Sequence, residues 1–355
     1  MSAAVILGLV AAVSTYGGVK RFRRWAERRQ ILDLPNARSS HTRPTPRGGG
    51  VIIVAVTLVG GAFLVAALAP AYPWPAYLPY AAGALLVAGV SWIDDLRSLP
   101  NSLRFAVHLL ATLVAIAGLG YWHVIDLPLY GPLALGWWGA VLTAVWIVGL
   151  TNAYNFMDGS DGIAGGLALA AGLGWALLGW EAGALLVGGL GLLIACSCLG
   201  FLVHNWPPAR IFMGDVGSAF LGYTLAVLPV MFAGIGSESG AAPVVGCALV
   251  WPFVFDTAFT FTRRLLRREN VFSAHRSHLY QRLIAAGSSH RRVALIYVSL
   301  ALVGCILAQR QTRWTGHGVG FIGLPLLSLC LWAFVVLQER RVVHTSSNLS
   351  SLADV

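Results

Sequence analysis

Long apolar segments separated by short polar ones dominate the hydrophobic pattern of this chain. A helix that crosses a bilayer needs about 20 consecutive, mostly apolar residues, and eleven segments meet that requirement within a few residues. The pattern therefore predicts an all-α integral membrane protein with about 11 transmembrane helices. The predicted spans are residues 3–19, 49–69, 77–93, 105–122, 136–152, 163–180, 183–203, 217–235, 242–262, 293–309 and 318–337.

Basic residues lie almost entirely on one side of this predicted topology. Alternating the spans places six segments on that side: 20–48, 94–104, 153–162, 204–216, 263–292 and 338–355. Together they hold 22 of the 24 Lys and Arg residues. Because Lys and Arg accumulate in cytoplasmic loops, this side is expected to be cytoplasmic, with the N-terminus outside and the C-terminus in the cytoplasm.

The composition agrees with a membrane protein. The chain of 355 residues is 57% hydrophobic and 11% charged, whereas a soluble domain has about 25% charged residues. The formal net charge of +10 follows from the one-sided basic loops, so nucleic acid is not an expected partner. The five cysteines lie in apolar segments and are expected to be packing residues. We expect a single membrane domain over residues 1–340 and a Ser-rich, disordered cytoplasmic tail over 341–355.

The most informative polar stretch is TNAYNFMDGSDGIAGG, residues 151–166, which lies between two strongly apolar segments. It carries Asn155, Asp158 and Asp161 at intervals of three residues, and on a helical turn this spacing places them on one face. Carboxylates at a membrane boundary are costly, so they indicate a functional site. The alternative is a solvated loop before a glycine-rich helix start.

Other polar clusters fall on the same side of the predicted topology. Oxygen ligands such as carboxylates and amides suit Mg²⁺, while Arg, His and glycine-rich backbone suit phosphate. Together they predict metal-assisted phosphoryl transfer at the boundary of cytosol and membrane. The plainer alternatives are a solvated Asp pair, a helix cap at Asp215 and a basic loop beneath anionic lipid. The clusters are Asp94 with Asp95, Asp215 in FMGDVGS, and His275, Arg276 and His278 in AHRSH.

Asp256 lies inside the ninth predicted span, four residues after Pro252. We favour a structural carboxylate that is paired inside the helix bundle. The functional alternative is a support for the polar loop that follows the span.

Four motifs in order resemble the polyprenyl-phosphate N-acetylhexosamine-1-phosphate transferase superfamily, of the glycosyltransferase family 4 type. The resemblance covers about residues 30–285. PNARSSHTRPTPRGGG (35–50) and HRSHLYQRL (275–283) resemble the bacterial branch that initiates O-antigen and similar surface polysaccharides. The peptidoglycan branch usually has a triple-His run where this chain has His-Arg-Ser-His, so a phospho-MurNAc-pentapeptide translocase is the alternative within the superfamily. The four motifs are DDL (94–96), NAYNFMDGSDG (152–162), FMGDVGS (212–218) and AHRSH (274–278).

The resemblance implies transfer of an N-acetylhexosamine 1-phosphate from a UDP-sugar to undecaprenyl (polyprenyl) phosphate, with release of UMP. It also implies a bacterial inner membrane location, an active site facing the cytoplasm, and Mg²⁺ as cofactor, with Mn²⁺ as an alternative. By motif position, Asp215 and Asn155 would be metal ligands, while Asp161 and Phe212 would hold uracil. The remaining implied site residues are Asn205 at the nucleotide, Asp94 and Asp95 at the lipid phosphate, Asp158 as a further catalytic carboxylate, and His275, Arg276 and His278 at the diphosphate and sugar.

A rival from another class is an ion-coupled transporter, which would require carboxylates near the bilayer midplane. Only Asp256 lies well inside a predicted span, so we favour the enzyme. A general-base role for Asp94 stays open, although a phosphate monoester with a second pKa of about 6 hardly needs one. The motifs do not select among N-acetylhexosamines.

Overall fold

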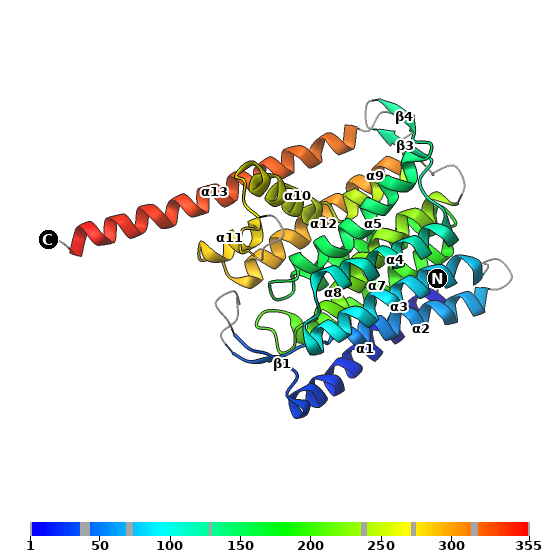
Figure 1. Cartoon of the computed structure of the whole chain (residues 1–355), viewed down its shortest axis with the longest axis horizontal. Helices are drawn as coiled ribbons and strands as arrows, with labels where there is room; N and C mark the ends of the chain where they lie inside the picture. The colour runs from blue at the N-terminus through cyan, green and yellow to red at the C-terminus, as the bar shows by residue number, and fades with distance from the viewer. Residues whose placement is uncertain are drawn as a thin grey trace.

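The computed structural model of the protein describes residues 2–35, 43–68, 74–127, 130–235, 240–270, 275–313 and 319–353. Within these residues the chain is almost entirely helical (Figure 1). Its elements are α1 Ser2–Arg29, β1 Leu32–Asp33, β2 Thr45–Pro46, α2 Gly50–Leu68, α3 Trp74–Arg97, α4 Asn101–Leu119, β3 Val124–Leu127, β4 Gly131–Ala134, α5 Trp138–Met157, α6 Ile163–Glu181, α7 Leu185–Asn205, α8 Asp215–Ala233, α9 Ala242–Leu249, α10 Trp251–Leu266, α11 Leu279–Ala285, α12 His290–Arg313 and α13 Val319–Ala353.

The predicted span count is confirmed, with one refinement. Among the described residues, ten helices are long and apolar enough to cross a membrane. The ninth predicted span is instead a pair, α9 and α10, bent by 84° at a short break. The break falls at Val250, and Pro252 lies in the first turn of α10, where its missing N–H costs no helical hydrogen bond. Which end of the bundle faces the cytoplasm stays a prediction.

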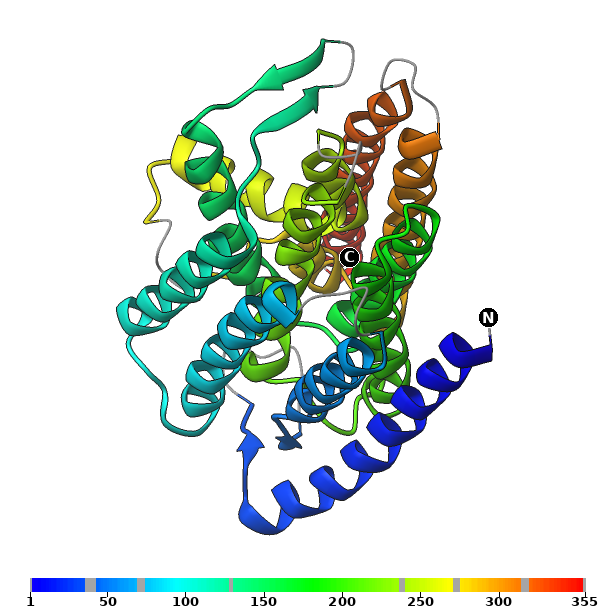
Figure 2. The ribbon, with the colours of Figure 1, turned by 90° about the vertical axis from the view of Figure 1, so that its right-hand side faces the viewer.

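Helix α8 lies at the centre of the bundle (Figures 1 and 2). In its most apolar stretch 94% of the residues are buried, compared with 22% in α1 and α4 and 17% in α13. Helices α2, α3, α5 and α9 pack against α8, and α6 and α7 pack against each other. The outer helices therefore present their apolar side chains to lipid, and the central helices form the core.

Small residues allow the helices to approach closely. Between α6 and α7, a Cβ atom added to Gly172 would lie 2.7 Å from the carbonyl oxygen of Gly191. A Cβ added to Gly191 would lie 2.7 Å from the backbone nitrogen of Ala176. Such contacts favour helix association in lipid, where no hydrophobic driving force acts between apolar helices.

Two antiparallel hairpins lie at opposite ends of the bundle, and neither was predicted (Figure 1). The β1–β2 hairpin pairs Leu32 with Pro46 and Asp33 with Thr45. The β3–β4 hairpin joins α4 to α5. Because β1–β2 directly precedes α2, it directs residues 47–50 toward the start of α8.

Helix α13 continues to Ala353, where a disordered tail over 341–355 was expected. Residues 342–353 contain neither Gly nor Pro, so no residue in this stretch strongly opposes the helix. Residues 354 and 355 lie outside the described residues.

Candidate active site

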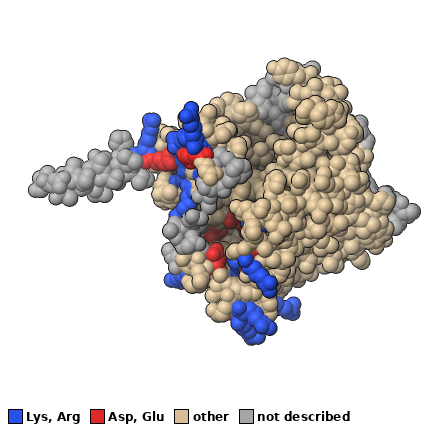
Figure 3. Space-filling view, in the orientation of Figure 1, with Lys and Arg blue, Asp and Glu red and all other residues tan. Residues whose placement is uncertain are grey.

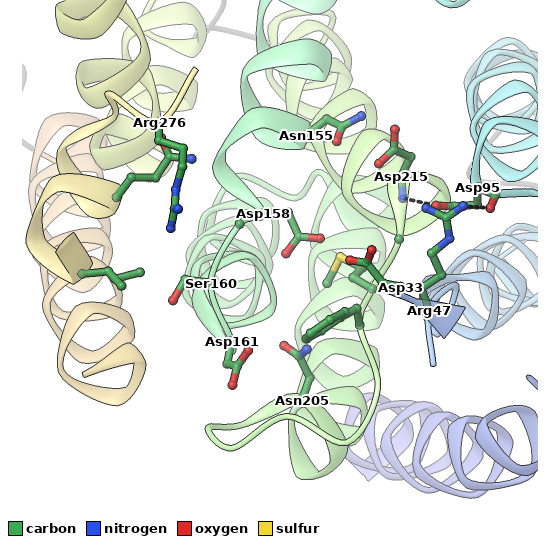
Figure 4. A pocket seen from close by; sticks show the side chains of 16 residues that line it. Asp33, Arg47, Asp95, Asn155, Asp158, Ser160, Asp161, Asn205, Asp215 and Arg276 are labelled. Atoms are coloured by element: carbon green, nitrogen blue, oxygen red, sulfur yellow. Dashed lines mark hydrogen bonds between the residues drawn. The ribbon is translucent and has the colours of Figure 1, made fainter. Parts of the chain in front are cut away.

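A pocket opens at the end of the bundle where the basic residues gather. Figure 3 shows Lys and Arg side chains around a hollow in which acidic side chains are visible. Five carboxylates and two guanidinium groups line this pocket, so its walls are predominantly negative. The lining residues are Asp33, Arg47, Asp95, Asn155, Asp158, Gly159, Ser160, Asp161, Asn205, Phe212, Met213, Gly214, Asp215, Arg276, Gln281 and Ile284 (Figure 4).

Glycines 48–50 pack on the segment before α8, whose residues 212–214 line the pocket. The backbone N–H groups of Gly49 and Gly50 donate to the carbonyl oxygens of Phe212 (3.0 Å) and Met213 (2.9 Å). A Cβ on Gly50 would lie 2.3 Å from the Cα of Gly217, so only glycine fits there. The predicted motif 35–50 therefore serves partly as backbone packing; its residues 36–42 lie outside the described residues.

Asp95 fixes the start of α8. Its Oδ1 accepts a hydrogen bond from the backbone N–H of Asp215 and its Oδ2 from that of Val216, both at 3.0 Å. These N–H groups have no partner within the helix, and a carboxylate also opposes the positive end of the helix dipole. Asp95 is 3% exposed. Its two oxygens therefore hold Asp215 in place; Asp95 also lines the pocket, and its contact with lipid phosphate stays a prediction.

Arg104 forms salt bridges with both Asp94 and Asp215. The Arg104 guanidinium pairs with Asp94 Oδ2 and lies 3.1 Å from Asp215 Oδ2. Asp94 Oδ1 also accepts the backbone N–H of Leu99 at 2.5 Å. Asp94 is 8% exposed and does not line the pocket. This pairing argues against the general-base alternative.

The segment with Asn155, Asp158 and Asp161 is not one helical turn, so the expected single helix face is wrong. Helix α5 ends at Met157, Asp158 is its C-cap residue, and Asp161 lies in the turn before α6. The turn reverses the chain through Gly162, whose φ of +74° suits glycine. All three side chains nevertheless line the pocket, because the turn folds back over it (Figure 4).

Asn205 connects this turn to the loop before α8. Its Oδ1 accepts the backbone N–H of Gly162 at 3.0 Å, and its Nδ2 donates to the carbonyl oxygen of Ile211 at 2.9 Å. Asn205 and Phe212 both line the pocket, and their role at the nucleotide stays a prediction.

Asp161 lies where two loops meet. Its Oδ2 accepts the backbone N–H of Ala209 at 3.0 Å, and its Oδ1 lies 3.6 Å from Nδ1 of His290. The same His290 nitrogen lies 3.2 Å from the Ser160 hydroxyl. Asp161 is therefore oriented by partners from the α7–α8 loop and from α12.

The chemistry of the carboxylates fits a divalent cation. Burial raises the pKa of the Asp158 carboxyl group well above its ordinary value. The nearby charges of Asp215, Asp95 and Asp161 raise that pKa further. Among the described residues, no group of three or more His, Cys, Asp or Glu side chains is arranged so that it could hold a metal ion by itself. Asn155, Asp158 and Asp215 offer side-chain oxygens on the same part of the pocket wall (Figure 4). A hard cation bound between them would relieve the repulsion between the two carboxylates.

Of the three residues predicted in the AHRSH motif, only Arg276 lines the pocket. Residues 275–278 are not helical, so the expected shared helix face for His275 and His278 is wrong. The two rings instead contact each other, with centroids 5.0 Å apart. His278 is 4% exposed, and its Nδ1 lies 3.2 Å from Asp256 Oδ1. The histidine rings therefore act behind the pocket wall. Ala274 lies outside the described residues.

His275 is expected to stay neutral throughout the physiological pH range. Burial, with the nearby His278, Arg264 and Arg263, lowers the pKa of His275 from 6.5 to about 4, although Glu269 opposes the shift. A group with this pKa loses its proton below pH 6, so it does not change charge between pH 6 and 8. We expect His275→Gln to leave the shape of the kcat/KM profile unchanged over that range. Loss of an acid limb in the variant would contradict the assignment.

Sequence reasoning missed several residues that the tertiary structure brings to the site. Arg47 lines the pocket and donates from Nη2 to the carbonyl oxygen of Asp95. In the sequence, Arg104 appears only as a basic residue of the predicted loop 94–104. Its separation from Asp94 by ten residues, across that loop, could have indicated the ion pair between them. Asp33 lines the pocket and belongs to none of the motifs, and Gln281 also lines it, although its motif HRSHLYQRL indicated only His275, Arg276 and His278.

Comparison with known proteins shows similarity to polyprenyl-phosphate sugar-phosphate transferases. The family model "Glycosyl transferase family 4" matches residues 77–233. The chain is 31% identical over 316 residues to the probable undecaprenyl-phosphate N-acetylglucosaminyl 1-phosphate transferase of Bacillus subtilis, a match covering 87% of this chain and 86% of that protein. It is 33% identical over 319 residues to the decaprenyl-phosphate N-acetylglucosaminephosphotransferase of Mycobacterium tuberculosis, covering 82% and 78%.

Two matches to phospho-N-acetylmuramoyl-pentapeptide-transferases cover less of the chain, and the one to the Moorella thermoacetica enzyme, 34% identical over 196 residues, covers 55% of this chain and 59% of that protein. The phospho-N-acetylmuramoyl-pentapeptide-transferase of Latilactobacillus sakei is 38% identical over 112 residues, which cover 32% of this chain and 35% of that protein. The two matches to N-acetylglucosamine transferases thus extend over most of the chain, whereas the two to pentapeptide transferases cover about a third and about half of it.

Proposed function

Because the chain belongs to glycosyl transferase family 4, the polyprenyl-phosphate N-acetylhexosamine-1-phosphate transferases, we propose that it transfers N-acetylglucosamine 1-phosphate from UDP-N-acetylglucosamine to undecaprenyl phosphate. The chain is a multi-pass membrane phosphoglycosyl transferase, and the resemblance seen in its motifs is confirmed. The observation that carries the proposal is the similarity to transferases of this sugar over most of both chains. We further propose that the product begins a cell-surface polysaccharide.

The reaction joins two phosphates. An oxygen of the lipid phosphate attacks the sugar-side phosphorus of the nucleotide sugar, a new P–O bond forms, and the P–O bond to UMP breaks. UMP leaves with the electron pair. The attacking group is already an oxyanion near neutral pH, because the second pKa of a phosphate monoester is about 6. The protein therefore has to align two anions and neutralise their charge.

The negative wall of the pocket suits the metal side of this task. Asn155, Asp158 and Asp215 would hold Mg²⁺, and the ion, when bound, would neutralise charge on the diphosphate. Asp95 and Arg104 hold Asp215 in position from behind. Arg47 and Arg276 supply fixed positive charge on other walls, and guanidinium groups bind phosphate oxygens in a bidentate manner.

The nucleotide end of the pocket is proposed to lie at Asp161, Asn205 and Phe212. A carboxylate accepts from the uracil N3–H, and an aromatic face stacks on the ring. We expect Asp161→Ala to weaken inhibition by UMP by roughly 10-fold or more, the effect of losing one hydrogen bond to a charged group, with CMP inhibition little changed. Inhibition constants for both nucleotides test this expectation. Asp33→Asn, which alters another pocket carboxylate, should leave the UMP-to-CMP ratio unchanged, and an unchanged ratio in Asp161→Ala would contradict the uracil role.

We propose that the pocket faces the cytoplasm of a bacterial inner membrane, as the Lys and Arg distribution supports. Two single-cysteine variants report the two sides of the membrane. Arg28→Cys lies in the last turn of α1, at the end of the bundle that holds the pocket, and Tyr130→Cys replaces a residue that is 86% exposed in the hairpin at the opposite end. In a background without the five native cysteines, an impermeant thiol reagent should label Tyr130→Cys in intact cells and Arg28→Cys only after permeabilisation. The reverse pattern would place the pocket outside.

The test of the reaction is UMP release by purified protein in detergent with undecaprenyl phosphate and Mg²⁺. We expect UDP-N-acetylglucosamine to be the best donor in a panel with UDP-N-acetylgalactosamine and UDP-MurNAc-pentapeptide. Preference for the pentapeptide donor would favour the peptidoglycan alternative. Absence of UMP release with every donor would overturn the proposed function.

A further inference from the structure

Asp256 is fully buried in α10 and outside the pocket, yet it organises part of the pocket wall. Its side chain is 0% exposed. The backbone N–H groups of Leu279 (2.8 Å) and Tyr280 (3.1 Å) donate to its two oxygens. Three side-chain partners from α10, α12 and the loop before α11 complete its surroundings. These are the Thr260 hydroxyl at 3.2 Å, the Tyr297 hydroxyl at 2.5 Å and Nδ1 of His278 at 3.2 Å.

These contacts determine where the Arg276 segment, residues 275–281, lies. The two backbone donors are the first N–H groups of α11, which no residue of that helix can satisfy. The same segment carries Arg276 and Gln281, both of which line the pocket. Gln281 is oriented in turn, because its Oε1 accepts the backbone N–H of His278 at 3.2 Å.

The Arg276 segment also contacts the segment that carries the carboxylates. The Tyr280 hydroxyl donates to the carbonyl oxygen of Phe156 at 3.1 Å. A Cβ on Gly159 would lie 2.1 Å from that hydroxyl oxygen, so the two segments are in close contact. Phe156 directly follows Asn155 and lies two residues before Asp158. Asp256 therefore connects two sides of the pocket through Tyr280. One side carries Arg276, and the other carries Asn155 and Asp158.

We propose that Asp256 is a positioning residue for the sugar-phosphate transfer: it holds the Arg276 segment so that Arg276 faces Asp158 and Asp215 across the pocket. His278 belongs to this buried anchor, and it acts through Asp256 and the start of α11. A buried carboxylate costs free energy, and five hydrogen-bonding partners offset that cost. The inference rests on the proposed function, because the aligned groups are those expected to bind the diphosphate.

The first experiment measures positioning without activity. Hydrogen exchange of the amides of Leu279 and Tyr280 is compared in wild type and Asp256→Asn, which retains the side-chain shape but removes one acceptor oxygen. We expect exchange to be at least roughly 10-fold faster in the variant, with helices α6 and α7 unchanged. Unchanged exchange at both amides would overturn the anchor, whether or not the proposed reaction is correct.

The second experiment is a double-mutant cycle on kcat/KM for UMP release. Asp256→Asn should cost roughly 10- to 100-fold in the wild-type background, the effect of a supporting contact that misplaces a binding group. It should cost less than about 3-fold in an Arg276→Ala background, and it should retain its full cost beside Asp161→Ala. Equal costs in all three backgrounds would show a general loss of structure and would overturn the proposal.

Two further variants keep the test decisive if Asp256→Asn does not fold. Tyr297→Phe leaves the Asp256 carboxylate and both of its backbone contacts intact and removes one hydrogen-bonding partner. It should lower kcat/KM about 3- to 10-fold, and this loss should be smaller in an Arg276→Ala background. Thr257→Val is the matched control from α10, because the Thr257 hydroxyl has no hydrogen-bond partner among the described residues, and it should have little effect. A cost for Thr257→Val as large as that for Tyr297→Phe would contradict the proposal. Failure of wild-type protein to release UMP would instead count against the proposed function.

Discussion

Asp215→Asn is expected to reduce kcat at least ~100-fold while the protein still inserts and folds. The substitution preserves the side-chain shape and removes the anionic oxygen that a hard cation prefers. The backbone N–H of Asp215 would still be held by Asp95, so the start of α8 should stay in place. The loss should therefore come from charge and metal affinity.

A titration of Mg²⁺ against UMP release distinguishes these effects from misfolding. The variant should require more Mg²⁺ than wild type and should not recover full activity at saturation. Asp126→Asn, in the hairpin at the opposite end of the bundle, controls for expression and stability and should behave like wild type. Near-normal activity of Asp215→Asn at limiting Mg²⁺ would remove Asp215 from the proposed metal ligands.

Arg276→Ala is expected to lower kcat/KM roughly 100-fold or more, the cost of a charge-assisted contact that is lost in the transition state. Arg276 lies on the wall across the pocket from Asp215, and Asp158 lies between them in Figure 4. Two substrates bring three phosphates into this space, so a fixed cation opposite the metal ligands offsets their repulsion. An arginine there stays charged at any working pH.

Two matched variants separate a binding role from a surface role. Arg276→Lys should recover only part of the loss, because lysine cannot form the bidentate contact. Arg267→Ala removes an exposed arginine near the end of α10 and should have little effect. Similar small losses in all three variants would mean that Arg276 only contributes to a basic membrane surface.

The number of spans and the side on which the motifs gather were predictable from residues alone. An apolar run of sufficient length has few options other than a helix in lipid, because every backbone N–H and C=O must be satisfied internally. This local constraint explains why α2, α6 and α7 begin or end within a few residues of the predicted spans. It also explains why motifs at helix ends share one end of the bundle.

The ends of elements were less predictable, because they depend on neighbours distant in sequence. The predicted span ends at residue 152, but helix α5 continues to Met157 and the chain then turns at Asp158. The turn is stabilised by Asn205, which is 43 residues away from Gly162. The bend between α9 and α10 likewise leaves Asp256 facing the Arg276 segment, which no periodicity indicated.

The difference between the role that a motif indicates and the contacts that a side chain makes is clearest at two buried residues, Asp95 and His278. The motifs placed Asp95 and His278 among the catalytic residues; both residues are buried, 3% and 4% exposed, and their side chains contact protein groups, although Asp95 also lines the pocket. Asp95 holds α8, and His278 contacts Asp256 beside the start of α11. A motif records which residue types are needed near the site, but it does not distinguish a side chain that meets substrate from one that supports its neighbour.

The membrane architecture, the transferase superfamily and the set of segments that meet at the pocket could all be predicted from the sequence. These follow from apolar length, charge distribution and ordered motifs, all of which are local properties of the chain. Three contacts became evident only from the folded chain: Arg47 lines the pocket, Arg104 pairs with both Asp94 and Asp215, and Asp256 binds the start of α11 in the Arg276 segment. These contacts join residues up to 111 positions apart, and buried polar groups pair with whatever partner the packing of helices brings within hydrogen-bonding distance.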